Sequence, residues 1–268
     1  MYIAGIVILI LTCLYVCSVK GRRGHGGLKA LCGWNYAHRG LHSAGVPENS
    51  MAAFRAAKDA GYGIELDIHL MCDGNLAVIH DSSLKRTAGA DVIVEEQTAE
   101  KLENYRLEGT QEKIPLLSHV LDLFQGEAPL IVELKAWKGN HAQLCKAACE
   151  LMENYNGPYC MESFDPRCVA WLRKNRSDVI RGQLTENFFR SNSRLPWILK
   201  FVMKHQLLNF LTRPDFVAYR YSDRKTVSNF LCRKLWGMQG VSWTLCSQEE
   251  LDTAVQEGWI PIFEGFCP

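Results

Sequence analysis

The feature that most restricts the fold of this 268-residue chain is a regular alternation of short apolar runs and amphipathic segments. The apolar runs have the length and composition of buried parallel strands, and the segments between them have the apolar spacing of surface helices. The predicted strands are 34–37, 63–68, 130–134, 159–162, 180–184, 216–218, 241–244 and 260–263. The predicted helices are 50–60, 116–124, 141–155, 166–174, 196–208, 224–235 and 248–257. A strand–helix unit repeated about eight times predicts a (β/α)8 TIM barrel.

One segment interrupts this alternation. Residues 75–112 follow an Asp73-Gly74 turn and start with a short strand-like run, so we expect a small insertion between the second and third barrel strands. An open doubly wound sheet is the alternative fold, but no GxGxxG motif follows the first strand. With 47% apolar residues, the region 33–268 is expected to form one barrel domain.

The N-terminus differs from the rest of the chain. Residues 3–19 carry no charge, and Lys20, Arg22 and Arg23 follow at once. With the two residues before it, this run could span about 28 Å as a helix, which predicts a single-pass transmembrane anchor over 1–19. A cleaved signal peptide is less favoured because no basic residue precedes the run and no small-x-small site follows it. The positive charges after the run predict that the catalytic domain is cytoplasmic, and residues 20–32 are interpreted as a basic, Gly-rich linker.

Charge and cysteine content limit the partners. The net charge of +1 argues against nucleic acid as the main partner, because proteins that bind nucleic acid usually carry a basic stripe. The eleven cysteines form no CxxC pair, which indicates thiols of a reducing compartment and not a zinc site. No obligate protein partner is evident from the sequence.

Carboxylates occur where buried strands are expected. Glu65 and Asp67 lie two residues apart in one strand, so they point to one face. Glu133 lies at the end of the next barrel strand and Lys135 follows it, two residues on, so this pair also points to one face. Three carboxylates from neighbouring strands would repel one another unless a cation lay between them. A hard divalent cation bound through oxygen, Mg²⁺ or Ca²⁺, is therefore expected on Glu65, Asp67 and Glu133. A buried Glu65–Lys135 ion pair is the structural alternative.

Two histidines are expected on the same face of the barrel. His38 and Arg39 end the first strand, and His80 and Asp81 end the short run inside the insertion. Each histidine by itself could be a core residue that hydrogen-bonds to backbone. Because the active sites of such barrels lie at the carboxyl ends of the strands, the convergence of these side chains favours a functional site.

Five sequence blocks contain these residues. They are AHRG (37–40), PENSMAAF (47–54), ELDIHLMCDG (65–74), VIHDSSLKRT (78–87) and VELK (132–135). In order and spacing the blocks resemble the glycerophosphodiester phosphodiesterase family. The second half of the chain is similar more loosely, in ESFDP (162–166) and SWTL (242–245), and the ending IFEGFCP (262–268) departs from the TDxP-like motif that is commoner in the family. This departure leaves the expected chemistry unchanged, but the shape of the leaving-group pocket stays open.

The resemblance implies a lipid-metabolism hydrolase that converts glycerophosphodiesters to sn-glycerol 3-phosphate and an alcohol, with a divalent cation and two histidines. His38 and His80 would exchange the protons as acid and base, without a choice of which is the acid. Arg39 and Lys135, together with the metal, would stabilise the charge that develops on the phosphate.

Three more residues are weaker candidates for a role in the site. Trp243 and Phe164, at the ends of later strands, could pack against an apolar part of the substrate, although core packing is the simpler role for Phe164. Asn49 could hold metal or substrate, or could cap the helix that follows it.

Two other functions stay open. The first is a phospholipase-like phosphodiesterase that acts on a lysophospholipid or a phosphoinositide, with the substrate's own hydroxyl as nucleophile. The second is a catalytically silent, membrane-tethered binding module. The presence of both histidines and all three carboxylates speaks against the silent module.

Overall fold

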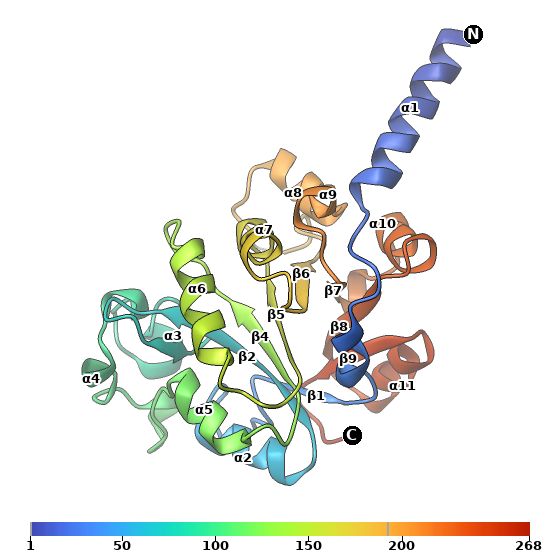
Figure 1. The fold of residues 1–268 in the computed structure, drawn as a ribbon. Coiled ribbons are helices and arrows are strands. Elements are labelled where there is room, and N and C mark those ends of the chain that lie inside the picture. The colour runs from blue at the N-terminus through green and yellow to red at the C-terminus, as the bar shows by residue number, and fades with distance from the viewer. Residues whose placement is uncertain (1, 192) are drawn as a thin grey trace.

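The computed structural model describes residues 2–191 and 193–268, and its centre is a closed barrel of parallel strands (Figure 1). The barrel strands are β1 (Tyr36–His38), β2 (Gly63–Leu70), β4 (Leu130–Leu134), β5 (Tyr159–Ser163), β6 (Arg181–Thr185), β7 (Phe216–Arg220), β8 (Gln239–Leu245) and β9 (Trp259–Phe263). Their order is β1-β9-β8-β7-β6-β5-β4-β2, and β1 also pairs with β2, which closes the barrel. The predicted TIM barrel is confirmed.

Helices surround the barrel, as the apolar spacing predicts. They are α2 (Met51–Asp59), α5 (Leu117–Phe124), α6 (His141–Met152), α7 (Pro166–Asn175), α8 (Trp197–Lys204), α9 (Asn209–Thr212), α10 (Val227–Phe230) and α11 (Gln248–Gln256). Local sequence explains where several of them begin. Ser50 caps α2 by accepting a hydrogen bond from the Ala53 amide, and Ser247 caps α11 in the same way through the Glu250 amide.

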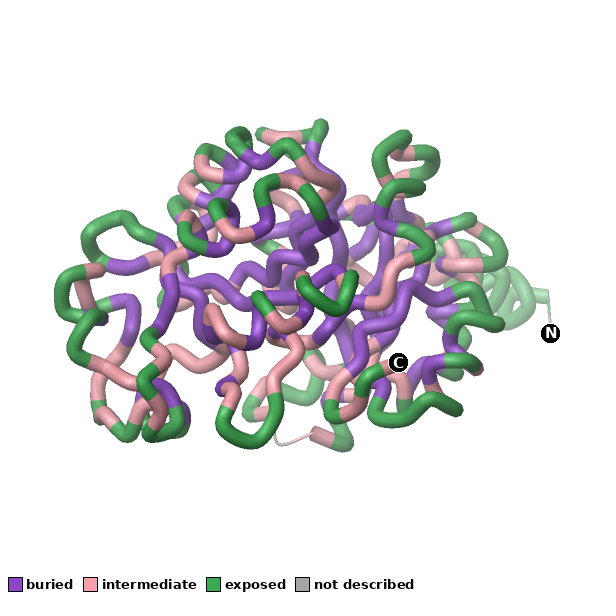
Figure 2. Tube along the Cα trace, turned by 90° about the horizontal axis from the view of Figure 1, so that it is seen from below, coloured by how far each residue is buried: buried purple, intermediate pink, exposed green. Residues whose placement is uncertain are grey.

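Two hydrophobic cores result from this arrangement. One lies between the strands and the helices and includes Phe54, Leu66 and Val132. The other fills the barrel interior and includes Tyr36, Ile131 and Phe216. Figure 2 shows the buried strands at the centre and exposed residues around the edge. Side chains therefore fill most of the barrel, which leaves the loops at the carboxyl ends of the strands as the place for a site.

The expected insertion after the second strand is present. It contains β3 (Leu76–Val78), which pairs antiparallel with β2, and the short helices α3 (Lys85–Ala88) and α4 (Ala99–Leu102). Its apolar residues form a small core of their own around Ile79, Leu84 and Val94. The insertion thus folds as a separate layer that holds the loop after β3 against the barrel.

The predicted transmembrane anchor is not supported. The apolar run forms helix α1 (Tyr2–Ser18), which projects from the barrel (Figure 1). Its 17 residues measure about 26 Å, less than the roughly 30 Å of a bilayer's hydrocarbon core. Among the described residues, no helix combines the length and the apolar character needed to cross a membrane. Residue 1 of the predicted anchor lies outside the described residues.

The segment after α1, interpreted above as a linker, contacts the barrel. Val19 is fully buried against Val217 and Met238. Arg22 forms a bidentate ion pair with the buried Asp215, with Nε 2.5 Å from Oδ1 and Nη2 2.6 Å from Oδ2. A 3₁₀ helix at Gly26–Leu31 then places Leu31 in the core inside the barrel.

The two neighbouring arginines of this segment give a matched test of its contribution to stability. Arg22→Ala leaves the Asp215 carboxylate, which is 2% exposed, without its cation, so we expect the free energy of unfolding to fall by about 2–4 kcal/mol. Among the described residues, Arg23 donates to the exposed backbone oxygens of Trp236 and Leu235, and its guanidinium lies over the Trp236 ring, so Arg23→Ala should cost about 1 kcal/mol or less. Urea denaturation measures both values, and equal losses would contradict the role of the buried pair.

Candidate active site

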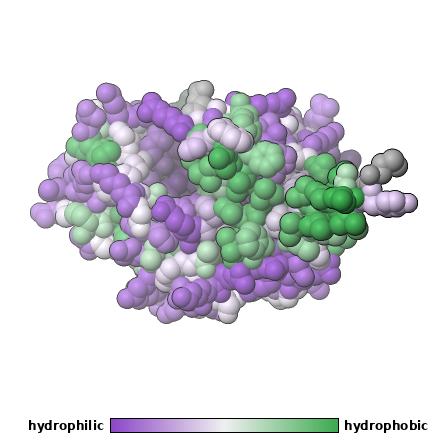
Figure 3. All heavy atoms as spheres, turned by 90° about the horizontal axis from the view of Figure 1, so that it is seen from above, coloured by the Kyte–Doolittle hydropathy of each residue, from purple (hydrophilic) through white to green (hydrophobic). Residues whose placement is uncertain are grey.

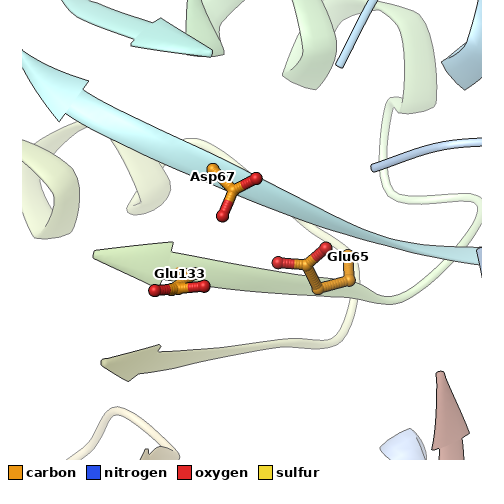
Figure 4. A group of neighbouring side chains, drawn as sticks. All are labelled: Glu65, Asp67 and Glu133. Carbon is orange, nitrogen blue, oxygen red and sulfur yellow. The ribbon is translucent and has the colours of Figure 1, made fainter. Parts of the chain in front are cut away.

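Three carboxylates meet at the carboxyl end of the barrel. Glu65 and Asp67 come from β2 and Glu133 from β4, and the register of the two strands puts Asp67 opposite Glu133. One oxygen from each residue lies within 4.8 Å of the others, and all three side chains are buried. Figure 4 shows the three side chains turned toward one another. The structure thus brings together the residues expected to bind metal.

Lys135 lies at the edge of this carboxylate cluster. Its Nζ is 2.9 Å from Asp67 Oδ1 and 2.8 Å from Glu133 Oε1. Burial alone would lower the pKa of Lys135, but the two carboxylates raise it, so the ammonium stays charged. The alternative of a Glu65–Lys135 pair is not what the structure shows, because Lys135 pairs with the other two carboxylates.

The pKa values of the three buried carboxylates are shifted in different directions. Burial would raise the pKa of Asp67, but Lys135 and His80 lower it well below its ordinary value. Burial and the neighbouring Asp67 raise the pKa of Glu65 well above its ordinary value. For Glu133, burial raises the pKa to about 7 despite Lys135. A single lysine therefore does not neutralise the cluster, and its oxygen donors suit a hard divalent cation such as Mg²⁺ or Ca²⁺.

The loop after β1 is built around the cluster. The Arg39 amide donates to Glu65 Oε2 at 3.2 Å, and Arg39 Nε lies 3.5 Å from Asp67 Oδ2. Asn49 Nδ2 donates to the same Asp67 oxygen at 2.9 Å, so Asn49 holds a predicted metal ligand, while Ser50 caps the helix. Arg39 and Asn49 both have a positive φ, 56° and 53°. Such a conformation is costly for Arg39 and is tolerated more readily by Asn49. The contacts of both residues with the cluster hold the loop in this conformation.

His38 lies between two carboxylates. Its Nε2 is 3.8 Å from Glu65 Oε2, and its Nδ1 forms a short hydrogen bond with Glu264 Oε2. Burial lowers the pKa of His38, although the hydrogen bond with Glu264 opposes this effect. The same hydrogen bond, together with the nearby His42 and Arg39, lowers the pKa of Glu264 to about 2. Glu264 therefore fixes the ring and directs Nε2 to the cluster.

His80 has an equivalent partner. Its Nδ1 lies 2.6 Å from Asp81 Oδ1, and Arg86 Nε donates to the other oxygen of Asp81 at 2.5 Å. Burial and the nearby Lys135 lower the pKa of His80 to about 4. His80 lines a cleft of about 390 Å³ that also contains Glu133 and Lys135. Neither predicted catalytic histidine is a core residue bonded to backbone alone.

A third histidine, His69 of β2, has a structural role. His69 is buried, with Nδ1 2.7 Å from Glu95 Oε1 and Nε2 3.2 Å from the backbone oxygen of His80. It supports the loop that carries His80.

Phe164, which follows β5, and Trp243, which lies in β8, are next to each other. Their ring centroids are 5.6 Å apart in an edge-to-face arrangement, and Phe164 makes a similar contact with Phe188 at 6.1 Å. Phe164 also lines the catalytic cleft. The two residues predicted to contact an apolar part of the substrate thus form one aromatic group beside the site.

Two carboxylates of the site were not among the predicted residues. Glu264 follows β9, and the pairing of Ala37 with Phe263 places it beside His38. Its position just after the last strand was the signal that could have identified it. Glu162 of β5 is paired in register with Glu133, and burial raises its pKa well above its ordinary value. Its Oε2 has no hydrogen-bond partner among the described residues.

Known proteins are similar to this chain in sequence and in fold. Residues 38–262 match the family model described as "Glycerophosphoryl diester phosphodiesterase family". A glycerophosphodiester phosphodiesterase of Caldanaerobacter subterraneus is 28% identical over 83% of this chain and 89% of its own length. The mouse protein named Lysophospholipase D GDPD1 is 33% identical over 60% of this chain and 49% of its own length. An Oleispira antarctica phosphodiesterase, solved with the product sn-glycerol-3-phosphate, has a TM-score of 0.70 at 22% identity, covering 86% of this chain and 92% of that one.

Cation binding to the carboxylate cluster can be tested without an activity assay. If Mg²⁺ or Ca²⁺ binds the folded chain only, a concentration of about 100 Kd stabilises it by about 2.7 kcal/mol and raises Tm by about 5 °C. We expect this shift in the wild-type protein and its loss in Asp67→Asn. The control is Glu150→Gln, which changes an exposed carboxylate of α6 outside the site. Differential scanning calorimetry measures Tm, and an equal shift in Asp67→Asn would contradict the assignment.

Proposed function

Because the chain belongs to the glycerophosphoryl diester phosphodiesterase family, we propose that it hydrolyses glycerophosphodiesters to sn-glycerol 3-phosphate and an alcohol, with a divalent cation and two histidines. One observation carries this proposal. Two histidines, each hydrogen-bonded to a carboxylate, flank three converging carboxylates at the catalytic end of the barrel. The product bound in the Oleispira antarctica phosphodiesterase supports the choice of substrate.

The divalent cation, Arg39 and Lys135 would hold the phosphate beside the carboxylate cluster. Glu65, Asp67 and Glu133 would bind the divalent cation, which as a Lewis acid stabilises negative charge on the non-bridging oxygens of the phosphate. Arg39 and Lys135 lie against the same carboxylates. Their positive charges are therefore fixed before the substrate binds, which is the condition for electrostatic stabilisation of the transition state.

The two histidines would move the protons. A water oxygen forms a bond to phosphorus while the bond from phosphorus to the alcohol oxygen breaks. The water loses one proton, and the alcohol oxygen gains one. Because Glu264 and Asp81 occupy the Nδ1 atoms, Nε2 of His38 and of His80 is the nitrogen that can exchange these protons. The negative charge of a bound diester raises the pKa of both rings, which lets one of them hold the proton it must donate.

We propose separately that the barrel lies in the cytoplasm. All eleven cysteines of the chain are free in the structure. This supports a reducing environment and hence the predicted cytoplasmic location of the barrel.

A catalytically silent barrel is the rival function, and an assay with a chelator separates it from the enzyme. We expect the purified protein to release choline from glycerophosphocholine. Excess EDTA should abolish the reaction, and Mg²⁺ or Ca²⁺ should restore it, because the carboxylate cluster binds the cation that the phosphate needs. Full activity in EDTA would contradict the metal, and absence of activity with every divalent cation would favour the silent module.

Substitution of the histidines tests the proton transfers. His38→Ala and His80→Ala should each lower kcat by a factor on the order of 10²–10⁴ and leave the cation-induced rise in Tm intact. The double variant should lose less than the product of the two factors. His119→Ala is the control, because His119 is exposed and, among the described residues, its ring accepts a hydrogen bond only from the Leu116 amide.

A second substrate distinguishes the acid from the base. A nitrophenyl phosphodiester has a leaving group that needs little protonation, so loss of the acid should affect its hydrolysis far less than loss of the base. Two variants equally impaired on both substrates would contradict separate roles. A kcat close to that of the wild type in either variant would remove that histidine from the mechanism.

A further inference from the structure

A second cavity opens beside the catalytic cleft. It has a volume of about 470 Å³, and its walls come from the end of β5, the loop after β6 and helix α8. Phe164 and Asp165 line both this cavity and the cleft that contains His80. The two spaces therefore share a wall at the catalytic end of the barrel.

The walls of this cavity are apolar. Phe164, Phe188, Leu195, Leu199 and Met203 contribute most of its lining. The charged residues at its rim, Asp165 and Arg167, pair with each other, with Arg167 Nη2 2.6 Å from Asp165 Oδ2. The cavity thus offers a hydrocarbon group an apolar surface and offers a polar group few partners. Its volume is in the range of small-molecule binding pockets.

The surroundings of the cavity are apolar as well. On α8, Trp197, Ile198 and Phe201 are exposed next to the lining residue Leu199. Figure 3 shows hydrophobic side chains gathered on this face of the molecule and, separately, at the projecting N-terminal helix. A hydrocarbon chain that leaves the catalytic cleft past Phe164 would therefore meet a mostly apolar surface.

We propose that this cavity binds the acyl chain of a lysophospholipid, so that the preferred substrate is a glycerophosphodiester that retains one fatty acyl group. The inference rests on the proposed function, because it places the phosphate at the carboxylate cluster. The glycerol that carries the chain is joined to that phosphate directly, and Phe164 borders both spaces. Water adds to phosphorus and the bond to the headgroup alcohol breaks, so the products are an acylglycerol 3-phosphate and the alcohol. The acyl ester bond is unchanged.

A series of substrates that differ only in chain length tests the inference. The series is glycerophosphocholine and the hexanoyl, octanoyl, decanoyl and dodecanoyl lysophosphatidylcholines, all below their critical micelle concentrations. Each methylene that becomes buried should raise kcat/KM by up to roughly fourfold. We expect a rise with chain length that stops once the chain fills the cavity.

Two neighbouring residues of α8 provide a matched pair of variants. Leu199→Asp puts a carboxylate on the wall of the cavity, whereas Ile198→Asp puts it on a side chain that is 59% exposed and does not line the cavity. Both positions lie in the first turn of α8, where an acidic residue is favourable, so neither variant should unfold the helix. Leu199→Asp should lower kcat/KM for the dodecanoyl substrate at least about tenfold, and leave glycerophosphocholine unaffected. Ile198→Asp should change neither value.

The outcomes separate the two proposals. Hydrolysis of glycerophosphocholine with no dependence on chain length, or an equal loss in both variants, would overturn the acyl site and leave the proposed function standing. If no substrate is hydrolysed, the proposed function fails, and binding then decides the acyl site. Calorimetric titration with dodecylphosphocholine monomers should show binding to the wild type and to Ile198→Asp but not to Leu199→Asp. No binding to the wild type, or equal binding to both variants, would overturn the inference.

Discussion

The pairing of β2 with β4 is the constraint on which the rest of the site depends. Its register sets Asp67 opposite Glu133, and the alternation along β2 turns Glu65 to the same side. Three carboxylates are thereby buried in one place, which no chain tolerates without compensating charge. Lys135, which follows β4, and Arg39 supply part of it. The part that they do not supply is the reason why the site suits a divalent cation.

Closure of the barrel adds the second element of the site. Because β1 pairs with both β2 and β9, His38 lies between Glu65 of one neighbouring strand and Glu264 after the other. The insertion supplies the matching arrangement of His80 and Asp81, and its own small core holds that loop in place. Each histidine has its Nδ1 occupied by a carboxylate and its other nitrogen available. The two positions come from unrelated parts of the fold but have the same chemistry.

The apolar cavity extends the site away from this charged centre. Phe164 forms the boundary between the two, with polar groups on one side and the lining of α8 on the other. Such a division suits a substrate that is itself divided into a phosphate and a hydrocarbon chain. Under the proposed reaction, the polar centre would determine which bond breaks, and the cavity would determine which substrates bring that bond to it.

The sequence by itself determined the barrel, the insertion and the identity of the three clustered carboxylates and both histidines, because these follow from local periodicity and from blocks of adjacent residues. Only the tertiary structure decided which residues contact these side chains. Glu264 is 226 residues from His38 along the chain, and only the β1–β9 pairing brings them together. The same holds for Asn49, whose contact with Asp67 depends on a loop conformation with positive φ. The cavity beside Phe164 also depends on residues from three separate elements. A sequence pattern records what each residue can do within its own strand or helix, whereas these contacts arise from packing between elements that the pattern does not relate.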